Sequence, residues 1–151
     1  MTEARITNSQ KQTVAERANY CCEYCLSQLR YSPDPFSIEH ITPLSQGGLS
    51  HLDNLAFACQ GCNSRKYTST TALDPISGET VSLYHPRQER WNDHFAWNDD
   101  FTLMLGLTST GRATIENLQL NRDGVVNLRQ VLHSIGKHPP GSSPNDYVSA
   151  L

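Results

Sequence analysis

Two Cys-x-x-Cys pairs frame the part of this chain whose side chains can do chemistry. The pairs are Cys22/Cys25 and Cys59/Cys62. Four thiolates at this spacing can close a tetrahedral zinc shell, and two pairs separated by a loop are typical of structural zinc sites. The other interpretations are reduced core thiols and an isolated redox pair. Cys21 makes the cysteine count odd, which argues against a disulfide framework, and we interpret it as a partly buried free thiol.

The segment between the two pairs carries Glu39, His40 and Asn54, and Asn63 follows the last cysteine directly. An unperturbed imidazole titrates near pH ~6.5, so His40 can take a proton from water near neutral pH. A carboxylate is a hard ligand for a divalent cation, and an amide can orient a neighbour by hydrogen bonds. Together these are the residue types that metal-assisted phosphodiester cleavage needs.

Each of these four residues also has a structural interpretation. Glu39 and His40 can be ordinary residues of a strand, Asn54 can cap a turn, and Asn63 can be the N-cap of a helix. His51 lies three residues before Asn54, and we interpret it as a surface or structural residue.

The order and spacing of these pieces resemble the HNH endonucleases, the ββα-metal nucleases. The matching stretch runs from about Cys22 to Lys66, and besides the cysteine pairs it contains Glu39-His40-Ile41-x-Pro43, Gly47-Gly48, Asn54-Leu55 and Asn63-x-x-Lys66. The resemblance implies an α+β protein with a zinc-stapled ββα-metal core. It further implies a divalent-metal-dependent DNA endonuclease that uses one metal ion and leaves 5′-phosphate and 3′-hydroxyl ends.

The resemblance also implies a role for each polar residue. His40 is the general base, and Asn54 holds His40 or its loop by amide hydrogen bonds. Glu39 and Asn63 are the ligands of the catalytic ion. The family usually has Asp or His at the first of these positions and often His at the second, and the oxygen ligands of this chain favour Mg²⁺ or Mn²⁺ over zinc there. Neighbouring strand residues point to opposite faces, so Glu39 should point away from His40, although a twisted strand still lets both border one pocket.

Basic side chains offer only local contacts for DNA. Arg65 and Lys66 follow Asn63 on the same expected helix and are the candidate phosphate contacts. We expect Arg112 and Arg122 to be solvated or to form local ion pairs. The aromatic stretch 84–97 is expected to form the core of a small extension, and the alternative is a DNA-contacting stripe that uses the basic residues His85, Arg87 and His94.

Composition limits the remaining classes. The chain has 151 residues and a net charge of −3, so a DNA-binding face must be a local patch rather than a whole-protein field. No apolar run is long enough to span a membrane, and the N-terminus has no apolar signal core. We therefore expect a cytoplasmic protein, where cysteines stay reduced. A homodimer and a monomer both remain open.

The elements that must position these residues follow from local patterns. We expect a helix over residues 9–20, a strand over 36–41, a short strand or turn over 53–58, and a helix over 62–70. The sequence of the second half predicts strands over 81–84 and 101–107, a helix that opens in 86–91, and helices over 113–120 and 125–135. The expected organisation is a nuclease core (1–70), a mixed α/β extension packed on it (71–138), and a flexible tail (139–151).

Two other functions use the same cysteines. One is a non-catalytic zinc-finger-like module that binds nucleic acid or protein. The other is a zinc-stabilised interaction protein whose second half is the working surface. Whether the substrate is single- or double-stranded, and whether cutting is sequence-specific, does not follow from the residues.

Overall fold

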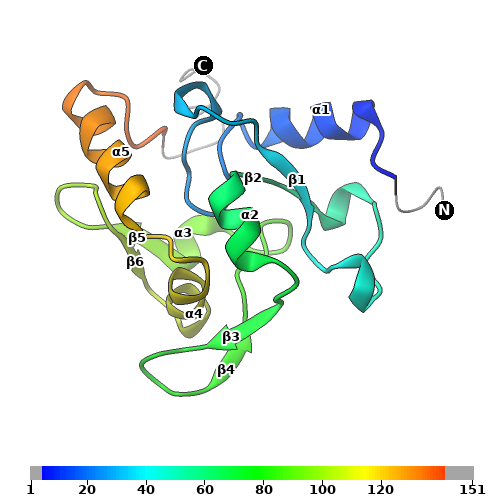
Figure 1. Ribbon diagram of the computed structural model, residues 1–151. Coiled ribbons are helices and arrows are strands. Elements are labelled where there is room, and N and C mark those ends of the chain that lie inside the picture. Colours follow the sequence, from blue (N-terminus) through cyan, green and yellow to red (C-terminus); the bar gives the residue numbers. More distant parts are fainter. Residues whose placement is uncertain (1–4, 142–151) are drawn as a thin grey trace.

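Helices and short antiparallel strand pairs make up the described part of the chain. The computed structural model describes residues 5–141, and Figure 1 shows how the elements are arranged. Within that range the strands form three two-stranded sheets, β1–β2, β3–β4 and β5–β6. The expected α+β class is confirmed. The expected tail lies outside the described residues from residue 142 onward.

The first half contains a hairpin between two helices. In chain order its elements are α1 (Asn8–Arg17), β1 (Ser37–His40), β2 (Leu55–Ala58) and α2 (Gln60–Lys66). β1 and β2 are antiparallel, with His40 opposite Leu55 at one end. Val14 of α1 is buried against Leu55 and Phe57 of β2. The hairpin therefore has α1 on one face, and α2 follows β2 directly.

Helix ends explain why the expected boundaries shifted. Thr7 and Gln10 form a capping box that starts α1, but Asn19 and Tyr20 have φ of 53° and 58°, so the helix cannot continue to residue 20. Cys59 caps α2, which therefore begins before Cys62, and Tyr67 with φ of 48° ends it at Lys66.

Up to residue 141, the second half contains seven helices and strands. They are β3 (Thr71–Leu73), β4 (Thr80–Ser82), α3 (Trp91–His94), β5 (Phe95–Trp97), β6 (Met104–Gly106), α4 (Ser109–Leu118) and α5 (Asp123–Ser134). The β3–β4 hairpin projects at the bottom of Figure 1. β3 and β5 were not expected, whereas β4 and β6, which are equally short, overlap the strands expected over 81–84 and 101–107. Two of the three expected helices correspond to α4 and α5, although α4 begins four residues earlier than predicted. The helix expected to open in 86–91 begins only at Trp91, as α3, after a turn over 86–88.

One buried cluster joins the two halves. It contains the four paired cysteines together with apolar residues of the second half, among them Leu83, Tyr84, Phe95, Met104, Leu118 and Leu120. The aromatic stretch 84–97 supplies much of it: Tyr84 and Phe95 pack edge to face with ring centroids 5.3 Å apart. This packing agrees with the core interpretation of that stretch. Two of the three basic candidates there lie against carboxylates, Arg87 against Glu23 and His94 against Glu89. The third, His85, accepts the backbone amides of Arg87 and Gln88 at Nδ1.

No helix within residues 5–141 has the length and apolar character needed to cross a bilayer.

Candidate metal and catalytic site

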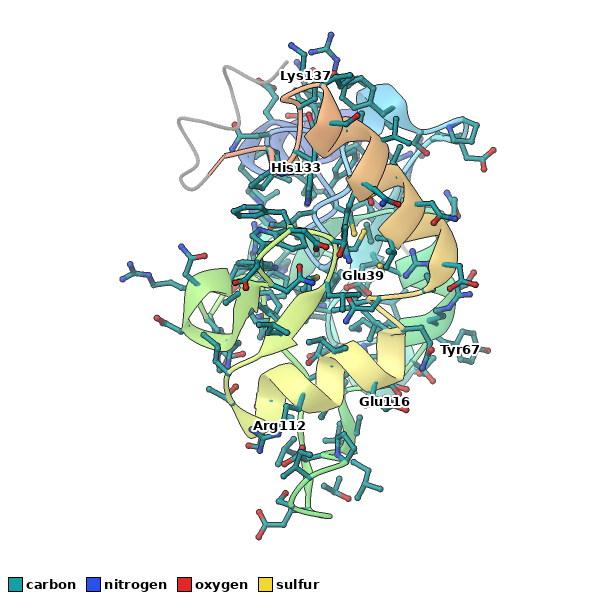
Figure 2. All side chains as sticks on the ribbon, turned by 90° about the vertical axis from the view of Figure 1, so that its left-hand side faces the viewer. Glu39, Tyr67, Arg112, Glu116, His133 and Lys137 are labelled. Atoms are coloured by element: carbon teal, nitrogen blue, oxygen red, sulfur yellow. The ribbon has the colours of Figure 1, made fainter. Side chains whose placement is uncertain are left out.

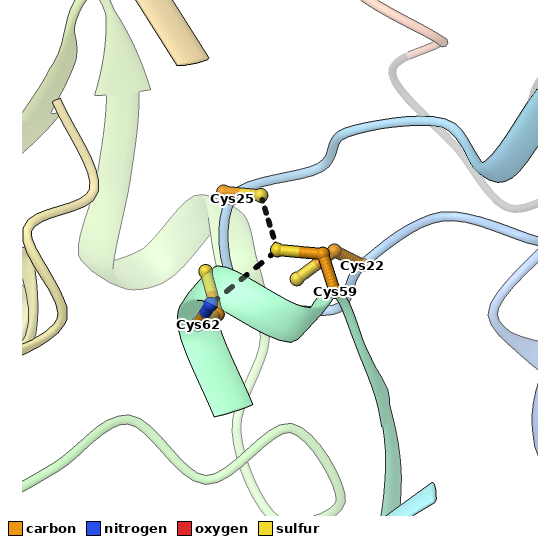
Figure 3. A group of neighbouring side chains, drawn as sticks. All are labelled: Cys22, Cys25, Cys59 and Cys62. Carbon is orange, nitrogen blue, oxygen red and sulfur yellow. Dashed lines mark hydrogen bonds between the residues drawn. The ribbon is translucent and has the colours of Figure 1, made fainter. Parts of the chain in front are cut away.

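The four paired cysteines converge from the turn at Cys22–Cys25 and from the start of α2. Their sulfur atoms all lie within 4.8 Å of one another, and Figure 3 shows them grouped around the start of α2. Tetrahedral zinc with Zn–S bonds of about 2.3 Å requires sulfur atoms about 3.8 Å apart. The Cys25 and Cys59 sulfurs are 3.7 Å apart. The donor set and its spacing therefore fit zinc.

Local backbone structure brings each cysteine pair to the cluster. The amide of Leu26 donates to the Cys22 carbonyl, and the left-handed φ of 62° at Leu26 closes a tight turn after Cys25. Cys59 is the N-cap of α2, and its sulfur accepts the amide of Cys62 at 3.4 Å. Each Cys-x-x-Cys pair thus folds into one turn with both sulfurs on the same side.

Cys21 stays outside the cluster. It is buried, and its thiol donates to the Asn19 carbonyl at 3.5 Å. Burial and the nearby Cys25 thiol raise the pKa of Cys21 to about 12. It is therefore a free, protonated thiol, more deeply buried than the sequence suggested.

His40 stands at the end of β1, on the opposite side of the strand from the cysteines. Its Nε2 lies 2.9 Å from the Ser50 hydroxyl, and the Ser50 carbonyl accepts the side chain of Gln10 from α1 at 2.8 Å. Partial burial lowers the pKa of His40 below its ordinary value, which favours the neutral ring near pH 7. Ser50 was not singled out from the sequence, because nothing in its local pattern marks it as a partner of a residue ten positions earlier.

Asn54 holds the loop that follows His40. Its Oδ1 accepts the Thr42 amide at 2.8 Å, and its Nδ2 donates to the carbonyls of Thr42 and Leu49 at 3.0 and 2.9 Å. Gly48 lies against this contact, and a Cβ there would overlap the Thr42 carbonyl oxygen. The sequence left open whether Asn54 holds the His40 ring or the loop after it. The hydrogen bonds of the Asn54 side chain go to the loop.

Glu39 points to the other face of β1. It is 6% exposed, its Oε1 accepts the Tyr24 hydroxyl, and its Oε2 lies 3.2 Å from Lys66 Nζ. Figure 2 shows Glu39 in the body of the molecule. Burial raises the pKa of Glu39, and the Lys66 charge opposes that shift. Within this arrangement Glu39 and His40 do not meet.

Lys66 lies inside the protein, and this disagrees with the prediction that it contacts phosphate. It is 1% exposed, and its ammonium donates to the Ile41 carbonyl at 2.8 Å as well as pairing with Glu39. A buried lysine needs such a partner, because an unpaired charge in the interior is very costly. Arg65, the other candidate, is exposed on α2, with Nη1 donating to the Gly61 carbonyl at 3.2 Å.

Asn63 lies one helical turn before Lys66. Residues three apart share a side of a helix, so half-buried Asn63 lies on the side of α2 that carries the Glu39 contact. The amide oxygen of Asn63 and the carboxylate of Glu39 have the hard-donor chemistry that Mg²⁺ and Mn²⁺ prefer. Both Glu39 oxygens, however, already accept hydrogen bonds or pair with a charge.

Two arginines of the extension were expected to be solvated or to form local ion pairs. Arg112 forms the local ion pair expected of it, with two bonds to buried Asp74 at 2.8 and 2.9 Å. Arg122 differs from the prediction, because its half-buried guanidinium lies against the cysteine sulfurs, and no carboxylate of residues 5–141 pairs with it.

Residues 22–69, which are 48 of the 151 residues, match the family model described as HNH endonuclease. This match and the cysteine cluster confirm the resemblance that the sequence suggested, and the match implies a nuclease-like function with nucleic acid as its partner. No curated protein and no solved structure matches the chain.

Proposed function

We propose that the HNH endonuclease segment at residues 22–69 makes this chain a divalent-metal-dependent DNA endonuclease. It would hydrolyse phosphodiester bonds and leave 5′-phosphate and 3′-hydroxyl ends. The observation that carries this proposal is the placement of His40: a neutral, half-buried imidazole, oriented by Ser50, at the end of a hairpin stapled by four cysteines.

The zinc at the cysteine cluster would be structural. All four ligands come from the protein and are buried, which leaves no open position for water or substrate. Its contribution is to fix the loop before β1 and the start of α2 relative to each other. A cytoplasmic location, which we also propose, would keep the thiols reduced and available for the metal.

His40 is the proposed general base. A base needs a neutral ring with a free lone pair, and the lowered pKa of His40 provides the neutral form. If Nε2 donates its proton to the Ser50 hydroxyl, Nδ1 carries the lone pair that takes a proton from the attacking water. General-base catalysis of this kind contributes roughly 10²- to 10⁴-fold in rate.

Asn54 is the proposed positioning residue of this base. It clamps Thr42 to Leu49, and the Ile41 amide donates to the Asn54 carbonyl at 2.9 Å, so the backbone on both sides of the bend after His40 is fixed. Misplacing a catalytic group by about 1 Å can cost about 10²-fold in rate.

Glu39 and Asn63 are the proposed ligands of Mg²⁺ or Mn²⁺. When bound, such an ion supplies charge stabilisation for the crowded phosphorus and for the departing 3′ oxygen. Glu39 becomes available as a ligand only when the Lys66 ammonium withdraws. A cavity of about 430 Å³ borders Lys66, and its lining includes Ile41, Thr42 and Thr70, so the flexible side chain has room to move.

Phosphate contacts are proposed for Arg65, because it is exposed on the helix that carries Asn63. The net charge of −3 gives no general attraction to DNA, so binding should depend on such local groups.

The test is cleavage of plasmid and of single-stranded DNA by wild type, His40→Ala and His51→Ala, each with Mg²⁺, Mn²⁺ or EDTA. Bound zinc is quantified in all three proteins. His51 is an exposed histidine of the same segment and serves as the matched control. We expect metal-dependent cutting that only His40→Ala loses. Zinc-loaded, folded wild type that leaves both substrates intact would refute the proposal.

The second candidate is a non-catalytic zinc-finger-like module that binds nucleic acid or protein. The buried Glu39–Lys66 pair favours it, because that pair withdraws a carboxylate from metal binding. It predicts DNA or protein binding that His40→Ala leaves unchanged and no cleavage by wild type.

A further inference from the structure

The guanidinium of Arg122 lies on the sulfurs of the second cysteine pair. Its Nη2 is 3.5 Å from Cys59 Sγ and 3.7 Å from Cys62 Sγ, and its Nη1 is 3.6 Å from Cys62 Sγ. Arg122 is the N-cap residue of α5, far outside the segment that matches the HNH family. One residue of the extension thus contacts two of the four proposed zinc ligands.

The backbone around Arg122 holds the guanidinium in place. Nη1 also donates to the carbonyls of Leu118 and Gln119, at 3.3 and 3.1 Å. The guanidinium also packs against Gly61, where a Cβ would lie 2.5 Å from Nη2. Gly61 stands between Cys59 and Cys62, so the missing side chain is what lets Arg122 reach both sulfurs.

The positive charge of Arg122 explains why its contact with the cysteine sulfurs is favourable. Four thiolates around Zn²⁺ carry a net charge of −2, and the cluster is buried. A buried charge is costly unless hydrogen bonds or an opposite charge compensate it. Arginine is always charged and presents its donors as a fixed fork, which suits two adjacent acceptors.

A second arginine of α5 supports the first cysteine pair. Arg129 is buried, and its Nη2 donates to the carbonyls of Cys25 and Leu120, at 3.4 and 2.8 Å. The two arginines therefore contact both cysteine pairs. Arg122 contacts the sulfur atoms of Cys59 and Cys62, and Arg129 contacts the backbone carbonyl of Cys25.

We propose that Arg122 is a positioning residue of the zinc site: it holds the Cys59 and Cys62 thiolates in place and slows the loss of zinc. This role does not depend on DNA cleavage, because zinc release is measured on the protein alone. Partners of metal ligands typically change metal affinity by about 10- to 100-fold when they are removed.

The test follows zinc transfer from the full-length, zinc-loaded protein to a chromophoric chelator. Arg122→Gln should release zinc about 10- to 100-fold faster than wild type. Arg65→Gln is the control: it removes the same charge near Gly61, but Arg65 donates to a carbonyl and not to sulfur. We expect its release rate to equal that of wild type.

A second readout separates this role from simple loss of stability. In the Co²⁺-substituted protein, loss of hydrogen bonds to thiolate should shift the sulfur-to-metal charge-transfer band to lower energy in Arg122→Gln and not in Arg65→Gln. An unchanged rate together with an unchanged band in Arg122→Gln would overturn the proposal. If Arg122→Gln does not fold, Arg122→Lys is measured instead. A zinc release rate and a charge-transfer band that both equal those of wild type would then overturn the proposal.

Discussion

Replacing Lys66 with Met should destabilise the protein strongly and in a pH-dependent way. The substitution removes the ammonium that lies 3.2 Å from Glu39, with both side chains at most 4% exposed. At an effective dielectric constant of about 20, two unit charges at that separation attract by about 5 kcal/mol. Breaking a buried pair by removing one partner typically costs about 3–5 kcal/mol. We expect a loss of about 3 kcal/mol at pH 8, because relaxation around Glu39 offsets part of the attraction.

The pH dependence follows from the state of Glu39. Burial already raises the pKa of this carboxyl, and removal of Lys66 raises it further. A carboxyl whose pKa is higher in the folded state favours folding below its unfolded pKa, and that contribution is lost as pH rises through the folded pKa. The gap between Lys66→Met and wild type should therefore widen from pH 5 to pH 8.

The assay is guanidinium unfolding at both pH values with free zinc held constant, since bound metal adds to the apparent stability. Lys11→Met removes an exposed lysine of α1 and is the control. Adding Glu39→Gln to Lys66→Met should recover much of the loss, because no buried charge remains. A loss under about 1 kcal/mol at pH 8 would mean that the pair contributes little, as solvent-exposed pairs do.

The same variant tests the proposed catalytic ion. If Mn²⁺ and the Lys66 ammonium compete for Glu39, then Lys66→Met should bind Mn²⁺ roughly tenfold more tightly, which corresponds to about 1.4 kcal/mol. Titration calorimetry measures this. Unchanged or weaker Mn²⁺ binding in the folded variant would remove Glu39 from the ligand set.

Three further results are expected. Gly48→Ala should cost about 1–3 kcal/mol and reduce cleavage, because the new methyl overlaps the Thr42 carbonyl; denaturant unfolding and the cleavage rate check this. Cleavage should rise with pH through a pKa below the ordinary histidine value and then level off, because His40 acts in its neutral form; a pH–rate profile with its midpoint above pH 7 would contradict this. Removal of zinc by a chelator should unfold the hairpin region, which loss of circular dichroism would report; retained secondary structure without zinc would count against a structural zinc.

Local pattern was enough to predict the metal cluster and the hairpin. A Cys-x-x-Cys turn places two sulfurs on one side whatever surrounds it, so Cys22 and Cys59 could be assigned to one site from spacing. Alternation along β1 also predicted that Glu39 and His40 face opposite ways. The shape of each Cys-x-x-Cys turn and the alternation along β1 depend on residues within a few positions of one another, whereas joining the two turns in one site relied on the known pattern of zinc sites with two such pairs.

The features that sequence analysis missed depend on distant contacts. Lysine is almost always exposed, and only the fold brings Lys66 to Glu39, which is 27 positions earlier. Ser50 meets His40 across a loop, and Arg122 meets Cys62 from 60 positions away. β3 and β5 are strands of three residues whose pairing, not whose composition, defines them.

The extension (residues 71–138) packs against the region of the hairpin and contacts its cysteine pairs. One face of the β1–β2 hairpin packs on α1 through Val14, and the cysteine cluster packs with Tyr84 and Leu118 of the second half. Arg122 and Arg129 then bind the cysteine pairs from α5. Small domains rarely become stable through a hydrophobic core alone, and many of them add a structural metal. The precision of the proposed base therefore depends on residues that contribute no chemistry to the reaction.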